Sequence, residues 1–263
     1  MSLRRFARQL GGAAAVAALA LGAGGCAVTS PETTGSISRA STGPISEADA
    51  RRDLETLAAQ HRANPRDADT ALAYAKALRA LKQNTQAVAV LEQASLASPF
   101  NKPLLGAYGR SLADVGQYKK ALDVFERAHT PEDPDWRILS AQGTVLDQLG
   151  RHADAQRYYS SALKIVPDEP TVLSNLGLSY ALAKDLPRAE ETLRRAVASQ
   201  KADPRVRQNL ALVVGLQGRF AEAESIARSD LPSDEAASNV AYLKQMLSEA
   251  KSGKKLKGIT TGS

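Results

Sequence analysis

The most constraining feature of this sequence is a self-similarity with a period of 34 residues. Five repeats, beginning at Ala68, Lys102, Trp136, Pro170 and Pro204, follow one another without an insertion or a deletion. Position 20 is always alanine (Ala87, Ala121, Ala155, Ala189, Ala223), and position 8 is always glycine or alanine (Ala75, Gly109, Gly143, Gly177, Ala211). A fixed period of this length predicts similar structural units that stack in a row and bury their apolar faces against one another.

Within each repeat the apolar positions predict two helices. Positions 4, 7, 8 and 11 follow the spacing of one helical face. Small residues at positions 8, 20 and 27 allow helices to approach closely, and large residues at positions 11 and 24 fill the remaining space. At position 15, Gly116, Gly150 and Gly218 provide helix ends, whereas Lys82 and Lys184 occupy the same position in the first and fourth repeats. We therefore expect the turns at Lys82 and Lys184 to be less ideal.

These residues resemble the tetratricopeptide repeat, a helix–turn–helix unit of 34 residues, over residues 68 to about 231. The prolines at position 32, Pro99 and Pro167, agree with its signature. The resemblance implies an all-α fold: a solenoid over residues 46–250 that winds as a right-handed superhelix of about twelve helices, with single helices over 46–63 and 234–250 at its ends. Arg207 and Asp230 replace apolar or small residues, so the fifth repeat is expected to be a degenerate terminal unit.

The only cysteine, Cys26, follows a segment with the layout of a secretory leader. Three arginines lie near the start of residues 1–25, an uncharged apolar run follows, and small residues precede the cysteine. The run is too short and too rich in glycine for a comfortable membrane span. Ala-Gly-Gly-Cys resembles the lipobox of bacterial lipoproteins, which implies a signal peptide over 1–25 and acylation of Cys26, for example by palmitate. The alternative is a secreted protein that is cut near Ala23 and carries a free thiol.

Segments of biased composition flank the expected solenoid. Residues 26–45 are rich in serine, threonine, glycine and proline, which predicts a flexible tether. Residues 251–263 hold four lysines and no acidic residue, which predicts a disordered basic tail. The formal net charge of +6 comes from the leader and this tail, so the solenoid carries no basic footprint of the kind that nucleic-acid binding requires.

The sequence predicts no catalytic, metal or cofactor site. His61, His129 and His152 fall at different repeat positions and have no partner at metal-ligand spacing. No glycine loop resembles a phosphate cradle, and no serine lies in a nucleophile elbow. The protein is therefore expected to be no enzyme and to act through its surface.

The resemblance to tetratricopeptide repeats also implies where a partner binds, because first-helix positions 2, 5, 6, 9, 12 and 13 line the inner face in that family. The candidate groove residues are Lys76, Arg79, Gly106, Arg110, Arg137, Thr144, Asn175, Leu178 and Asn209. Gly106 is expected to leave the middle of the groove open. Such a groove suits a peptide or a helix of a protein partner, although each basic residue alone could simply be a solvated charge.

Anchor, tether and repeats together resemble the TadD family, the lipoproteins of the tight-adherence (Flp/Tad) pilus system. This resemblance implies an outer-membrane lipoprotein that faces the periplasm and assists pilus assembly, as pilotins assist secretin rings. Ala27 after the cysteine, in place of aspartate, is in keeping with the outer membrane. Its implied partners are a secretin or another pilus-assembly component, and the membrane through the lipid. The alternative is an envelope adaptor for peptidoglycan hydrolases or for outer-membrane protein assembly, and the sequence leaves the oligomeric state open.

Overall fold

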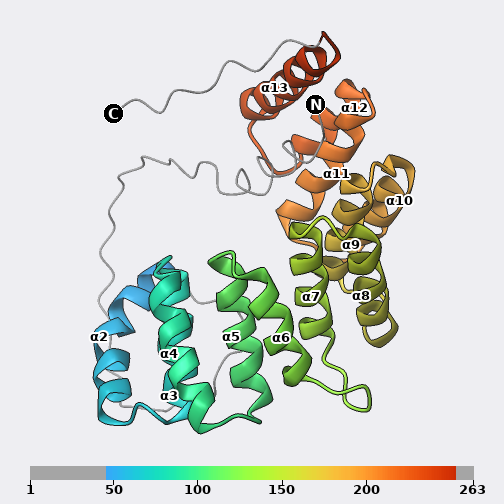
Figure 1. The fold of residues 1–263 in the computed structure, drawn as a ribbon. Coiled ribbons are helices and arrows are strands. Elements are labelled where there is room, and N and C mark those ends of the chain that lie inside the picture. Colours follow the sequence, from blue (N-terminus) through green and yellow to red (C-terminus); the bar gives the residue numbers. More distant parts are fainter. Residues whose placement is uncertain (1–45, 253–263) are drawn as a thin grey trace, which may run out of the picture. The chain divides into compact units, whose positions relative to one another are not determined.

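The computed structural model describes residues 46–252, and it is helical throughout (Figure 1). Twelve helices and no strands occur in this part of the chain, which confirms the predicted all-α class. None of these helices combines the length and the apolar character that a membrane crossing needs. The expected signal peptide over 1–25, Cys26, the tether over 26–45 and the tail from 253 onward lie outside the described residues.

The helices follow the repeats in chain order. They are α2 (Glu47–Ala63), α3 (Ala68–Ala80), α4 (Asn84–Ala97), α5 (Lys102–Asp114), α6 (Tyr118–Ala128), α7 (Trp136–Gln148), α8 (His152–Ile165), α9 (Pro170–Leu182), α10 (Leu186–Val197), α11 (Pro204–Leu216), α12 (Phe220–Ala227) and α13 (Ser233–Ser252). The chain divides after Gln117 into two compact bodies. The first body contains α2 to α5, and the second body contains α6 to α13.

The first helix of each repeat begins at the residue that the period indicates and is 13 residues long. The residue before each start caps the helix: a side-chain oxygen accepts a hydrogen bond from a backbone N–H of the first turn. The capping residues are Asp67, Asn101, Asp135, Glu169 and Asp203. Each cap satisfies an N–H group that has no partner inside the helix, so the period fixes helix starts as well as core positions.

Packing inside a repeat depends on how position 8 of the first helix meets position 24 of the second. A Cβ atom on Gly143 would lie 2.6 Å from Cε1 of Tyr159, and a Cβ on Gly177 would lie 2.6 Å from Cγ of Leu193. In the fifth repeat both positions are alanine, and Ala211 and Ala227 pack with Ala236 of α13. A large residue at position 24 thus takes the space that glycine leaves at position 8.

The turns between paired helices require a left-handed residue at position 15. Gly116, Gly150 and Gly218 adopt φ values of +74° to +86°, and Lys82 and Lys184 adopt +61° and +68°. The backbone N–H of the next residue bonds back to the first helix, as from Asp185 to the carbonyl of Tyr180 at 2.9 Å. The two lysines therefore adopt a conformation that is sterically unfavourable for a residue with a Cβ atom and that glycine adopts freely.

In the fifth repeat, two charged residues replace the apolar or small residues of the other repeats and pair with each other. Arg207 and Asp230 form a two-pronged ion pair, with Arg207 Nε 2.6 Å from Asp230 Oδ2. They occupy positions 4 and 27, where other repeats pack apolar or small side chains. Helix α13 closes the array, because Leu243 packs over Gly215 at a distance that leaves no room for a Cβ.

A network of charges joins the fourth and fifth repeats. The Glu190 carboxylate on α10 accepts hydrogen bonds from Arg194, from Gln217 at 2.7 Å and from Arg219 at 2.7 Å. Arg194 and Arg219 also contact Glu222 on α12. Burial acts to raise the pKa of Glu190, but these hydrogen bonds outweigh it and lower the pKa to about 2.

We expect Lys184→Gly to stabilise the protein by about 1 kcal/mol, because glycine carries no steric penalty at positive φ. Thermal or urea unfolding followed by circular dichroism measures the change. The reciprocal substitution Gly150→Lys, at the same position of the third repeat, should destabilise by a similar amount. A stability loss in Lys184→Gly would contradict the assignment of strain to this turn.

We expect Glu190→Gln to lower stability at pH 7 by about 1–2 kcal/mol, since hydrogen bonds to a charged group are lost. The folded pKa of Glu190 is depressed, so its contribution is present above the unfolded value near 4.5. It is lost as the pH falls toward 2. Wild type and variant should therefore converge over this interval in unfolding experiments. Glu191→Gln, on the exposed side of α10, is the matched control, and a pH-independent difference would exclude this role.

Candidate partner-binding surface

In the first body, the predicted groove residues come from α3 and α5, whose helices contact each other. Arg79 Nε donates to Asp114 Oδ2 at 2.7 Å and thereby joins the two first helices. Lys76 and Arg110 are half-buried. Gly106 is buried, contrary to the expectation that it opens the middle of a groove. A buried residue at this site offers little surface to a partner.

In the second body, α7, α9 and α11 lie in contact in that order, and a polar ladder joins them. Asn175 Nδ2 on α9 donates to Ser140 Oγ on α7 at 3.3 Å. One repeat later, Asn209 Nδ2 on α11 donates to Ser174 Oγ on α9 at 2.9 Å. In both pairs, position 6 of one repeat bonds to position 5 of the repeat before it.

The ladder uses only part of the hydrogen-bonding capacity of its two amides. Each asparagine uses one N–H in the ladder, and a primary amide has a second N–H and a carbonyl oxygen that can accept. Asn175 and Asn209 are half-buried, so their side chains are ordered and still reachable. A repeated pair of amide donors and acceptors suits the backbone of an extended peptide, which presents the complementary groups at regular intervals.

The other predicted residues of the second body surround this ladder. Arg137 is exposed, and its guanidinium lies 4.4 Å from the ring centroid of Trp136, which holds it by a cation–π contact. Thr144 is exposed, and its hydroxyl donates to the carbonyl oxygen of Ser140 at 3.1 Å. Leu178 is half-buried at the same repeat position as Thr144. We call Arg137, Thr144, Asn175, Leu178 and Asn209 the ladder surface.

A buried polar cluster lies behind the ladder surface and was not found from the sequence. The Asp147 carboxylate lies 2.8 Å from His152 Nδ1 and accepts hydrogen bonds from Ser179 at 2.8 Å and Tyr159 at 3.1 Å. Burial raises the pKa of Asp147, although these three partners act in the opposite direction. Burial also raises the pKa of Tyr159. The cluster joins α7, α8 and α9, and its only sequence signal is an acidic residue at position 12, where the other repeats differ.

The two remaining histidines contact side chains of neighbouring helices. His61 is buried and its ring lies 5.5 Å from that of Tyr74, while His129 Nε2 lies 3.1 Å from Gln142 Oε1. Over residues 46–252, no group of three or more histidine, cysteine or acidic side chains is placed to hold a metal ion.

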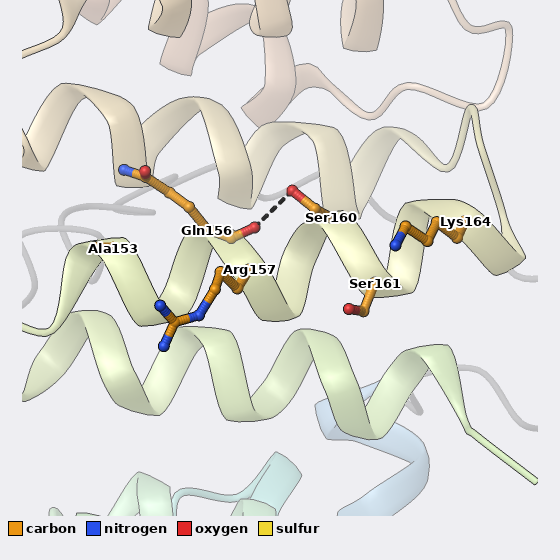
Figure 2. A pocket seen from close by; sticks show the side chains of 6 residues that line it. All are labelled: Ala153, Gln156, Arg157, Ser160, Ser161 and Lys164. Atoms are coloured by element: carbon orange, nitrogen blue, oxygen red, sulfur yellow. Dashed lines mark hydrogen bonds between the residues drawn. The ribbon is translucent and has the colours of Figure 1, made fainter. Parts of the chain in front are cut away.

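Two shallow hollows lie on the surface of residues 46–252. One, of about 370 Å³, lies over α8 and is shown in Figure 2. Its lining residues all come from that one helix: Ala153, Gln156, Arg157, Ser160, Ser161 and Lys164. Within it, the Ser160 hydroxyl donates to the carbonyl oxygen of Gln156 at 2.7 Å. A single convex helix does not enclose a small molecule in this hollow.

Comparison with known proteins gives a family match for part of the chain and a similar fold for most of it. Residues 140–206, from α7 into α11, match the tetratricopeptide repeat family. No curated protein sequence matches the chain closely enough to count as a relative. Structural similarity to tetratricopeptide solenoids confirms the predicted fold, at sequence identities that are too low to transfer a function.

Three solved structures illustrate this similarity. PilW, described as a widely conserved type IV pilus biogenesis factor, is 18% identical with a TM-score of 0.64, over 74% of this chain and 91% of PilW. The APC/C hetero-tetramer Cut9–Hcn1 gives 17% identity and a TM-score of 0.60 over 75% of this chain, which spans 40% of that longer chain. YrrB, a tetratricopeptide protein with an unusual peptide-binding site, is 18% identical with a TM-score of 0.50, over 72% of this chain and 99% of YrrB.

Proposed function

We propose that this tetratricopeptide-repeat solenoid is a non-enzymatic scaffold of the bacterial cell envelope that binds a protein partner on the ladder surface. We further propose that it is a lipoprotein of the outer membrane, anchored through Cys26 and facing the periplasm. Its role is to assist assembly of a Flp/Tad pilus or a secretin-type machine, in the manner of a pilotin.

The observation that carries the binding role is the repeated Asn–Ser ladder across α7, α9 and α11. It holds two amides one repeat apart, with an exposed cation at Arg137 and an aliphatic side chain at Leu178 beside them. Such a surface offers hydrogen bonds to a peptide backbone, an apolar contact for a side chain, and a charge that fixes orientation. An extended segment of a partner, with an acidic residue near Arg137, fits this chemistry best.

Two further observations support the assembly role. The fold resembles that of PilW, a protein described as a pilus biogenesis factor, over most of both chains. Ala-Gly-Gly-Cys at residues 23–26 follows a short apolar run, which is the arrangement that lipoprotein precursors share. An acylated protein would stay at the membrane where a secretin ring forms, because several acyl chains on one residue anchor a protein durably.

We expect Cys26 to be acylated. Cells that express the protein and are fed an alkyne-labelled fatty acid should incorporate the label, and Cys26→Ser should abolish it because no other thiol is present in the chain. In cell fractionation, the variant should then appear in the soluble periplasm, whereas the wild-type protein appears in the outer membrane. Label that persists in Cys26→Ser would reject the anchor and favour the secreted alternative.

We expect deletion of the protein to reduce both secretin multimers and surface pili, and wild type to restore them. Arg137→Glu combined with Asn175→Ala should restore at most about a tenth of the wild-type level, because it removes the orienting charge and one rung of the ladder. Immunoblots of detergent-resistant multimers and electron microscopy of pili measure the two effects.

The matched control is Arg157→Glu with Ser160→Ala, which makes the same kinds of change on the exposed side of α8 (Figure 2). It should complement like wild type. Normal multimers and pili in the deletion strain would overturn the pilus role and direct the search to envelope adaptor functions. Normal complementation by the ladder variant, with the deletion defective, would instead overturn the assignment of the binding surface.

A further inference from the structure

The two most exposed large apolar side chains of the described residues lie four residues apart in the first body. The exposed fraction is 90% for Phe100 and 80% for Leu96. Leu96 lies in the last turn of α4, and Phe100 lies in the turn between α4 and α5. Exposure of two such neighbouring side chains is costly in water and marks an interaction site when they lie close together.

Repeat packing does not require these two side chains. The same positions of the later repeats hold polar or small residues, namely Thr130, Lys164 and Ala198 for Leu96, and Pro134, Asp168 and Ala202 for Phe100. Leu96 and Phe100 therefore belong to the surface of the first repeat alone, and some property other than the solenoid's stability must account for them.

Two arginines precede the apolar pair by one 34-residue period. Arg62 precedes Leu96 by one period, and Arg66 precedes Phe100 by one period. The turn after α2 and the turn after α4 consequently lie at the same end of the first body, the lower end in Figure 1. A hollow of about 570 Å³ is lined by Arg66 together with Gln93, Leu96 and Ala97 of α4, so the cation and the aliphatic side chain share one surface.

This end of the first body holds the cations Arg62 and Arg66 and, at the start of α3, the carboxylates of Asp67 and Asp69. Arg62 and Arg66 are exposed, and neither has an acidic partner within ion-pair distance among residues 46–252. The nearby Asp67 is occupied in capping α3, where its carboxylate accepts from the backbone N–H of Thr70 at 2.8 Å. We call Arg62, Arg66, Leu96 and Phe100 the Phe100 patch.

We propose that the Phe100 patch docks on the surface of an anionic lipid bilayer, with Phe100 and Leu96 entering the headgroup region and Arg62 and Arg66 facing the lipid phosphates. This combination of protruding apolar side chains with adjacent cations is what interfacial membrane contact requires. A protein partner is less suited, because a stable protein interface buries about 800 Å² on each side. Two protruding side chains on a turn offer far less area.

This inference depends in part on the proposed anchor, which makes a weak contact effective. The chain from Cys26 to Ser46 can span at most about 70 Å when fully extended, and α2 adds about 25 Å along its axis. The patch at the far end of α2 is thus within reach of a bilayer that holds Cys26. Attachment converts docking into an intramolecular step with a high effective concentration, so two side chains and two cations suffice.

The test uses the full chain and couples its single thiol, Cys26, to vesicles that carry a maleimide-headgroup lipid. This attachment is independent of acylation in the cell, so failure of the proposed anchor and failure of the patch are distinguishable. The reporter is Phe100→Trp in a Trp136→Phe background, which leaves one tryptophan. The vesicles contain phosphatidylethanolamine and phosphatidylglycerol, with or without brominated acyl chains that quench tryptophan on contact.

The matched control is Gln83→Trp in the same background, because Gln83 is exposed at the opposite end of α4. We expect the emission of Trp at position 100 to shift to the blue and to fall at least twofold with brominated lipid, whereas Trp at position 83 changes little. Replacing phosphatidylglycerol by phosphatidylcholine, or adding Arg62→Glu and Arg66→Glu, should reduce the quenching at position 100.

Three outcomes would overturn the proposal. Equal quenching at positions 83 and 100 would mean that the patch has no preferred contact with the bilayer. Absence of quenching at both positions would mean that the body stays away from the membrane. A blue shift that depends on protein concentration and occurs without vesicles would identify a second copy of the chain as the occupant of the patch.

Discussion

The close approach of two helices inside each repeat is the constraint on which the rest of this structure depends. It requires glycine or alanine at position 8, and in the third and fourth repeats a Cβ at this position would collide with the side chain at position 24. Gly143 faces the ring of Tyr159, whereas Ala211 packs with Ala227. Because the helices meet this closely, first helices of successive repeats also come into contact, and side chains at positions 5 and 6 can bond from one repeat to the next.

Most of the fold could be predicted from the sequence because the period repeats the same packing problem five times. The first-helix starts and the end helices follow from the period and the local pattern to within two residues. The compensations at single sites could not be predicted. Arg207 and Asp230 each look like a defect in the sequence, and only the structure brings the two together as an ion pair that replaces an apolar contact. Lys184 shows the reverse case, since its unfavourable turn was expected and its φ is positive.

The candidate binding surface was less predictable than the fold. A repeat position predicts which face of the helix a side chain occupies, but it does not predict which neighbouring side chains it contacts there. Arg79 is held by Asp114, and Gly106 is buried, so the first body offers fewer open contacts than its sequence indicates. Asn175 and Asn209 are held in place by hydrogen bonds to Ser140 and Ser174. These two serines are buried, and nothing in the sequence marks them as functional. Such pairs become visible in sequence only when two repeats are compared at adjacent positions.

The polar residues of the second body divide between those that hold the repeats together and those of the proposed binding surface. The Asp147 carboxylate contacts His152, Tyr159 and Ser179, so its hydrogen bonds are made within the protein. The ladder amides are held from one side only, by a single serine each. An amide that is fixed by one bond loses little conformational entropy when a peptide engages its other groups, which is the advantage of a preorganised site. The same rigid packing that excludes a side chain at Gly143 therefore supplies the stiffness that the proposed recognition on the ladder surface needs.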